Sequence, residues 1–225
     1  MNSGYILFGV RSPLVVEYEE TLNRLAQVPV ASVSVNATPR VLDQSRVVSF
    51  EELSREDLEL LAAQGRFITC AFSSLRRRQL VELAVATGLQ PADALCDPTA
   101  ILPRSLRVRL GSFVNAGAII GGATFIGAHS LINRAVSIGH HCMIGDFVSI
   151  GPGATLASNI RVGDGATIGA GATIVPNINI GENAVVGAGS LVRSHVSDDC
   201  FVAGNPAVEK PLDRSRSALN TEGEE

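Results

Sequence analysis

The segment Ile132–Phe147 of this 225-residue chain, INRAVSIGHHCMIGDF, concentrates side chains that could take part in a reaction. His140 and His141 stand side by side, Cys142 follows directly, and Asp146 comes shortly after. An imidazole titrates near neutral pH, so it can accept or release a proton during a reaction. Asp146 could orient such an imidazole, or could be a solvated turn residue. Alternatively, each histidine could be a surface residue on a turn with no role in a reaction.

A repeat of six residues surrounds this segment. Every sixth residue from Leu102 to Val192 is Leu, Ile or Val. Glycine follows many of these aliphatic residues, and a small or β-branched residue usually comes four positions after them. A period of six fits neither an α-helix nor a simple hairpin, but it is typical of a β-solenoid with a short strand and a corner in each hexad. Ile138 then points inward, His140 lies near a corner, and Cys142 takes the small inward position, which favours packing.

Residues 1–95 have a different pattern, in which buried strands alternate with helices. We predict strands at 5–10, 29–35 and 66–72 and helices at 15–27, 49–65 and 73–88. Ser49 is the expected N-cap of the second helix, because a glutamate follows it three residues later. Gly88 is expected to end the third helix. This alternation is typical of a small parallel α/β domain. Residues 89–100 are the expected joint, and the polar tail 211–225 is expected to be disordered.

A small α/β domain followed by hexapeptide repeats resembles the hexapeptide-repeat sugar O- and N-acetyltransferases. Sialic acid O-acetyltransferases and UDP-amino-sugar N-acetyltransferases typify this family. The resemblance covers residues 5–210. It implies a left-handed parallel β-helix at 96–210 with three hexads per coil, so that residues 18 apart stack. It also implies that domain 1–95 holds a nucleotide-linked sugar, and that the β-helix forms a homotrimer with acetyl-CoA bound between subunits.

The same resemblance places His140 at the family's catalytic position. A histidine there would accept the proton of an amine or hydroxyl that attacks the thioester directly, without a covalent enzyme intermediate. His141 stands where the family usually has Asp or Glu, and it could contact the substrate or only be tolerated. Ser149 stands where the family often has a second histidine. The catalytic candidates are therefore His140, His141 and Asp146.

The resemblance also implies two groups of binding residues. For acetyl-CoA, the Ser158 amide would contact the acetyl group. The backbone of two glycine-rich turns, Gly169–Ala170 and Gly187–Ala188, would lie along the pantetheine arm. Arg193, Asn205 and Pro206, where the β-helix ends, would contact the nucleotide end of CoA. Simple coil geometry is the alternative reason for the glycines. For the acceptor they are Gly9, left from the family's GxGG turn, Arg11 as a charge beside it, and Asn36 after the second strand.

Composition and charge exclude several other classes of protein. The formal net charge of −4 and the pI near 5.6 provide no basic field for nucleic acid or an anionic membrane. The uncharged stretch Leu110–Asn133 is part of the soluble repeat, so we expect no membrane span. Four scattered cysteines and the lack of a basic, apolar leader predict reduced thiols and a cytoplasmic protein.

A zinc-dependent β-helix enzyme of the γ-carbonic anhydrase kind is the metal alternative. Such a site needs three imidazoles that converge between subunits. The histidines at 129, 140, 141 and 195 lack the usual HxxxxH spacing, so we expect no metal. The sequence thus predicts an acetyl-CoA-dependent transferase that acylates the amino group of a nucleotide-linked sugar. Sugar O-acetylation and a non-catalytic β-helix scaffold are the alternatives.

Overall fold

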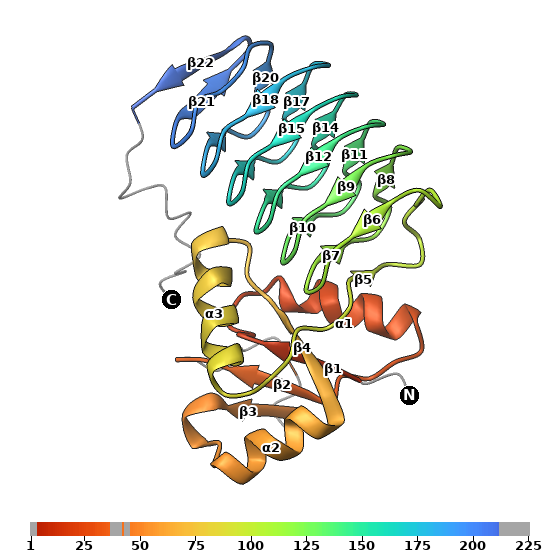
Figure 1. The fold of residues 1–225 in the computed structure, drawn as a ribbon, viewed down its shortest axis with the longest axis vertical. Coiled ribbons are helices and arrows are strands. Elements are labelled where there is room, and N and C mark those ends of the chain that lie inside the picture. The colour runs from red at the N-terminus through yellow and green to blue at the C-terminus, as the bar shows by residue number, and fades with distance from the viewer. Residues whose placement is uncertain (1–3, 37–41, 43–45, 212–225) are drawn as a thin grey trace.

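The computed structural model describes residues 4–36, 42 and 46–211, and shows a small α/β unit joined to a long stack of coils (Figure 1). The α/β unit contains a four-stranded parallel sheet in the order β3-β2-β1-β4, made of β1 (Gly4–Phe8), β2 (Ala31–Ser34), β3 (Val47–Ser49) and β4 (Gly65–Thr69). Among the described residues, three α-helices accompany it: α1 (Val15–Arg24), α2 (Arg55–Gln64) and α3 (Ser74–Ala86), and a 3₁₀ helix η2 covers Phe50–Glu52. The predicted tail 211–225 lies outside the described residues except for Pro211.

Strand β1 shows why the sheet carries an apolar cluster on each face. Successive side chains of a strand point to opposite sides. Leu7 accordingly packs in one cluster with Tyr18 of α1, whereas Ile6 and Phe8 pack in another with Leu80 of α3. Helix α3 ends as predicted, with Gly88 in the left-handed conformation (φ +89°).

The predicted N-cap of the second helix was wrong. Ser49 pairs with Ser34 as the last residue of β3, and its hydroxyl donates to Glu51. The cap of α2 is Ser54, whose Oγ accepts from the Asp57 amide at 3.2 Å while Asp57 Oδ2 accepts from the Ser54 amide at 2.9 Å. Both serines precede an acidic residue by three positions, so the motif alone fits both. Pairing of β3 with β2, a tertiary effect, decides between them.

The coils form three parallel sheets that run along the column (Figure 1). The first contains β5 (Leu95–Cys96), β7 (Phe113–Val114), β10 (Leu131–Ile132), β13 (Ser149–Ile150), β16 (Thr167–Ile168), β19 (Val185–Val186), β21 (Phe201–Gly204) and the antiparallel β22 (Ala207–Lys210). The second contains β8 (Ile119–Ile120), β11 (Ser137–Ile138), β14 (Thr155–Leu156), β17 (Thr173–Ile174) and β20 (Leu191–Val192). The third contains β6 (Arg107–Val108), β9 (Phe125–Ile126), β12 (Met143–Ile144), β15 (Arg161–Val162) and β18 (Asn179–Ile180).

Residues 18 apart stack, as the resemblance implied. Ile132 pairs with Ile150 above it and with Val114 below it. The repeated aliphatic residues from Val114 onward are buried in one continuous core, and Leu102 and Val108 at the open end are partly buried. Cys142 also lies wholly inside this core, where burial raises the pKa of its thiol. The structure therefore makes Cys142 a packing residue.

Close approach between coils explains the glycine that follows the inward aliphatic residue. A Cβ on Gly139 would lie 2.7 Å from the carbonyl carbon of Ala157 and 2.8 Å from the Ser158 amide nitrogen. We expect Gly139→Ala to lower the free energy of unfolding by about 1–3 kcal/mol, because the backbone of the next coil must move. Urea denaturation measures this. In Gly122→Ala, the nearest atom would be Ser105 Oγ at 3.5 Å, so this control should change stability by less than about 0.5 kcal/mol. Equal losses in both variants would contradict the explanation.

Aromatic and aliphatic contacts join the α/β unit to the first coils. The rings of Tyr18 and Phe113 stack with centroids 4.0 Å apart, and Leu131 belongs to the same cluster. Leu95, predicted as the last residue of the first domain, lies in β5 and pairs with Phe113. The two units therefore share a core at this junction.

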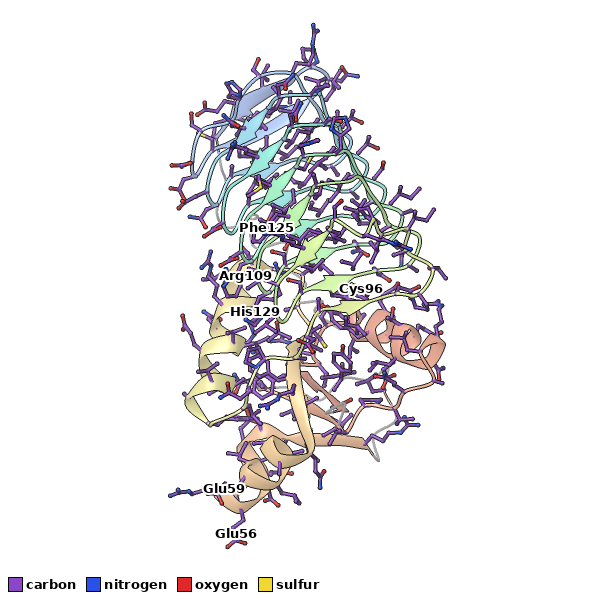
Figure 2. All side chains as sticks on the ribbon, turned by 45° about the vertical axis from the view of Figure 1, so that its right-hand side comes forward. Glu56, Glu59, Cys96, Arg109, Phe125 and His129 are labelled. Carbon is purple, nitrogen blue, oxygen red and sulfur yellow. The ribbon has the colours of Figure 1, made fainter. Side chains whose placement is uncertain are left out.

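A single buried arginine provides polar contacts across the same junction. Arg77 of α3 is 1% exposed, and burial lowers the pKa of its guanidinium to about 10. Its guanidinium donates to six neutral acceptors at 2.6–3.0 Å, namely the carbonyl groups of Ala71, Phe72, His129, Phe147 and Val148 and the hydroxyl of Ser149. His129 and Phe147 are one coil apart, so the guanidinium connects α3 to two successive coils. Figure 2 shows His129 where the β-helix meets the α/β unit.

Candidate active site

His140 and His141 form the corner that follows β11, and both side chains are exposed. The corner is held between neighbouring coils, because the His141 amide donates to Gly122 O at 2.9 Å and His140 O accepts from the Asn159 amide at 3.0 Å. His141 adopts the left-handed conformation with φ +58°. The stacked residues Ala123 and Asn159 have φ of +57° and +60°. The conformation of His141 thus belongs to the corner of the coil.

The two imidazole rings contact each other. The Nδ1 atoms of His140 and His141 are 2.9 Å apart, and the ring planes are perpendicular with centroids at 5.0 Å. Two ring nitrogens at this distance form a hydrogen bond in which one of them carries the hydrogen. The pair can therefore exist in two neutral arrangements that differ in which ring donates.

Asp146 lies at the next corner of the coil, after β12. Its Oδ1 accepts from the Ala128 amide at 2.7 Å, and its Oδ2 pairs with Arg109 at 3.5 Å. Asp164, one coil further on, caps the Asp146 amide in the same way at 2.8 Å. Figure 2 shows Arg109 on the β-helix near its junction with the α/β unit. Within the chain the structure does not bring Asp146 to His140, and it gives Asp146 the role of capping a turn.

Ser158 lies one coil beyond His140 at the same corner, as predicted. Its carbonyl accepts from the Asn177 amide at 3.1 Å. Within the part of the chain that the structure describes, the amides of His140 and Ser158 have no acceptor. The corresponding amides of Ala128 and Asp146 are capped by carboxylates, whereas those of Ala170 and Ala188 also have no acceptor among the described residues. The His140 corner thus presents unpaired backbone donors next to the imidazoles.

The remaining acetyl-CoA candidates lie at another corner of the coil or near the end of the column. Ala170 and Ala188 are exposed at the corner that follows the first sheet. A Cβ on Gly169 would lie 2.4 Å from the Ala188 amide nitrogen, so coil contact is sufficient to require this glycine. A Cβ on Gly187 would similarly lie 2.9 Å from Ala203 Cβ. Three further exposed candidates stand near the end of the column: Arg193, Asn205 and Pro206, of which the last two form the turn between β21 and β22.

The acceptor candidates lie at the ends of two neighbouring strands of the α/β unit. Gly9 is buried with φ +77°, a Cβ there would lie 2.4 Å from Leu80 Cδ1, and its amide donates to Val33 O at 2.8 Å. That amide is therefore committed to the fold. Arg11 is on the exposed loop after β1. Asn36 is exposed after β2, has φ +62°, and donates its amide to Glu51 at 2.9 Å.

The other histidines serve the fold. His129 is buried between the rings of Phe67 and Phe147, and burial, assisted by the nearby charge of Arg77, lowers its pKa from 6.5 to about 4. It therefore packs as a neutral ring at neutral pH. His195 accepts from the Asn179 amide at 3.0 Å through Nδ1. Among the residues that the structure describes, no group of three or more His, Cys, Asp and Glu side chains could hold a metal ion.

Sequence reasoning missed Arg77 as a determinant of this region, because it lies in the run Arg76–Arg78. A signal was present. Arg77 falls three residues before Leu80 and seven before Ala84, on the buried face of α3.

In the described ranges, no helix is both long and apolar enough to cross a membrane.

The stacked coils and their six-residue period are those of a hexapeptide-repeat β-helix. The family model for the bacterial transferase hexapeptide (six repeats) matches residues 141–176 and 159–194. No curated protein sequence matches the chain. The repeats identified from the sequence are thus confirmed over the coils that follow His140.

Solved structures match nearly the whole chain. A histidine-to-asparagine variant of perosamine N-acetyltransferase from Caulobacter crescentus, in complex with CoA and GDP-perosamine, is 27% identical with a TM-score of 0.83, covering 93% of this chain and 97% of its own. The acetyltransferase domain of PglB from Neisseria gonorrhoeae, in complex with acetyl coenzyme A, is 27% identical with a TM-score of 0.81 and coverages of 94% and 100%. WeeI from Acinetobacter baumannii, at 24% identity, a TM-score of 0.79 and coverages of 92% and 99%, shares the fold.

These matches confirm two predictions from the sequence. The fold class is an α/β unit followed by a left-handed parallel β-helix. The resemblance to hexapeptide-repeat sugar acetyltransferases is also confirmed, and it extends over the α/β unit. CoA is bound in the perosamine N-acetyltransferase variant and acetyl coenzyme A in the PglB domain, in agreement with the co-substrate that the resemblance implied.

Proposed function

We propose that this protein transfers the acetyl group of acetyl-CoA to the amino group of a nucleotide-linked amino sugar. The observation that carries the proposal is an exposed histidine pair on a coil corner, within a structure that matches GDP-perosamine- and CoA-bound perosamine N-acetyltransferase over 93% of the chain. A fold match alone would be compatible with a scaffold. The exposed imidazoles and the amides without acceptors at the same corner are what a transferase needs in addition.

His140 is the proposed general base. Its imidazole accepts a proton from the sugar amine as the amine nitrogen attacks the thioester carbon. The carbon–sulfur bond then breaks, and the proton passes to the CoA thiolate, so that an amide and free CoA are formed. Attack is direct and the enzyme is not acylated. The Ser158 amide, which has no acceptor among the described residues, is the proposed donor to the oxyanion of the tetrahedral intermediate.

We further propose that two subunits of a homotrimer build each site. The structure supports this because it separates the candidates onto different corners: His140 and Ser158 on one, Ala170 and Ala188 on another. CoA would lie along the glycine-containing turns of one subunit and end near Arg193, Asn205 and Pro206. The acceptor would approach from the loops that carry Arg11 and Asn36. Gly9 supports the shape of that loop, because its amide is already bonded.

The function is tested by release of the CoA thiol from acetyl-CoA, together with product mass. The acceptors are GDP-perosamine, further GDP-, UDP- and dTDP-linked amino sugars, free amino sugars and free sialic acids. We expect one nucleotide-linked amino sugar to gain the mass of one acetyl group. Acetylation of a hydroxyl would instead establish the O-acetyltransferase alternative. CoA binding without transfer to any of these would overturn the assigned acceptor class, and no CoA binding would favour a scaffold.

A further inference from the structure

The ring beside His140 is an imidazole, where the family that the sequence resembles usually has a carboxylate. A carboxylate can only accept a hydrogen bond at neutral pH, so it selects the tautomer of its partner. An imidazole can donate or accept. The 2.9 Å contact between the two Nδ1 atoms therefore leaves the tautomer of His140 open, and the chemistry of the base depends on which arrangement forms.

Only one of the two neutral arrangements gives a working base. If His140 Nδ1 carries the hydrogen and donates to His141 Nδ1, the Nε2 atom of His140 keeps its lone pair and can accept a proton. If His141 donates instead, His140 carries its hydrogen on Nε2 and cannot accept one there. A second hydrogen between the rings is excluded at 2.9 Å, because both nitrogens would be donors.

We infer that His141 is a positioning residue: its Nδ1 accepts from His140 Nδ1 and so holds His140 Nε2 ready to accept the substrate proton. This inference rests on the proposed role of His140 as the base. Main-chain hydrogen bonds with Gly122 and Asn159 fix the backbone that carries both rings. The two rings meet in a perpendicular contact at this left-handed corner.

A consequence for pH follows from the chemistry of the pair. One extra proton on His141 makes its Nδ1 a donor and converts His140 to the inactive tautomer, and one on His140 Nε2 occupies the base itself. The residues stacked against this corner are uncharged: Gly122 and Ala123 on one side, Ser158 and Asn159 on the other.

The first test reads the tautomer without any substrate. The protein is labelled with ¹⁵N-histidine, and ring nitrogen shifts are recorded above the titration range, with His140→Asn used for assignment. We expect Nδ1 of His140 to be protonated and Nε2 unprotonated in the wild type and in His141→Asn, whose amide oxygen also accepts. In His141→Ala the Nε2-protonated form should dominate. The same tautomer of His140 in all three proteins would overturn the inference.

The second test is the pH profile of kcat/KM with acetyl-CoA and GDP-perosamine. We expect His141→Ala to lower kcat roughly tenfold with an unchanged KM for acetyl-CoA, because tautomer selection is only part of the contribution of a general base. His141→Asn should retain most of kcat. His141→Asp should move the acid limb upward by about one pH unit, because a carboxylate stabilises the imidazolium.

Two controls distinguish a positioning role of His141 from a purely structural role in the turn. Ala123 and Asn159 already occupy the equivalent left-handed position, so alanine and asparagine are compatible with the backbone there. Asn177→Ala makes the matched change two coils away and should alter neither the tautomer nor the profile. If His141→Ala kept the wild-type kcat and the wild-type pH profile, His141 would have only a structural role in the turn, and the inference would be overturned. No turnover by the wild type would count against the proposed function, and the nitrogen shifts would then decide the inference alone.

Discussion

His140→Ala is expected to lower kcat for acetyl transfer by about 10²–10⁴-fold, which is the usual contribution of a general base. The ammonium that forms as the sugar amine attacks the thioester must lose its proton, and no other described side chain at the corner except His141 can take it. His140 is exposed, so the fold should persist. The measurement is CoA thiol release under saturating acetyl-CoA and acceptor.

The matched control is His195→Ala, which removes another exposed histidine from the same β-helix. It should retain kcat within about twofold, which is within the range of a surface substitution. CoA affinity and the oligomeric mass should be unchanged in His140→Ala. A variant that lacks His140 but keeps the wild-type rate would refute the base assignment. Loss of rate together with loss of CoA binding would show that the corner positions CoA instead of the proton.

The column of the β-helix could be predicted because its cause is local and repeated. Each hexad must place one aliphatic residue inward, so an aliphatic residue recurs at every sixth position from Leu102 to Val192. The close approach at Gly139 and the inward position of Cys142 follow from the same period. The left-handed position could also have been found, because asparagine or glycine recurs there in the later hexads, as in Asn159 and Gly189.

Features that depend on contacts between distant segments could not be predicted in this way. Ser49 and Ser54 carry equivalent capping motifs, and only the pairing of β3 with β2 makes the second serine the cap. Asp146 was a reasonable partner for a base in the same coil. The triangular path of the chain carries it to a different corner, where Ala128 and Arg109 occupy its carboxylate. Closeness in sequence therefore did not predict which side chains meet at a corner, whereas the six-residue period did predict which residues stack along the column.

Arg77→Ala is expected to lower the free energy of unfolding by about 3 kcal/mol, because a buried acceptor that is left without its donor typically costs about 1–3 kcal/mol. The guanidinium is fully desolvated and its acceptors are carbonyl groups and one hydroxyl, which lose their donor together. Ser149 would also lose its contact with the guanidinium, although its Oγ still donates to Phe72 O at 2.6 Å. Urea denaturation at fixed protein concentration measures the loss.

Arg76→Ala is the matched control, since it removes the same side chain from the same helix one position earlier. Arg76 is only partly buried, so its replacement should change stability by less than about 0.5 kcal/mol. Arg78 is less suitable, because its guanidinium lies 4.4 Å from the Phe147 ring centroid. Equal stabilities of the Arg76 and Arg77 variants would contradict the interpretation that one buried guanidinium secures α3 to two coils. Because Phe147 and Ser149 follow His140 in the same coil, a large loss in Arg77→Ala should also reduce acetyl transfer, through a loosened coil and not through a change in the base.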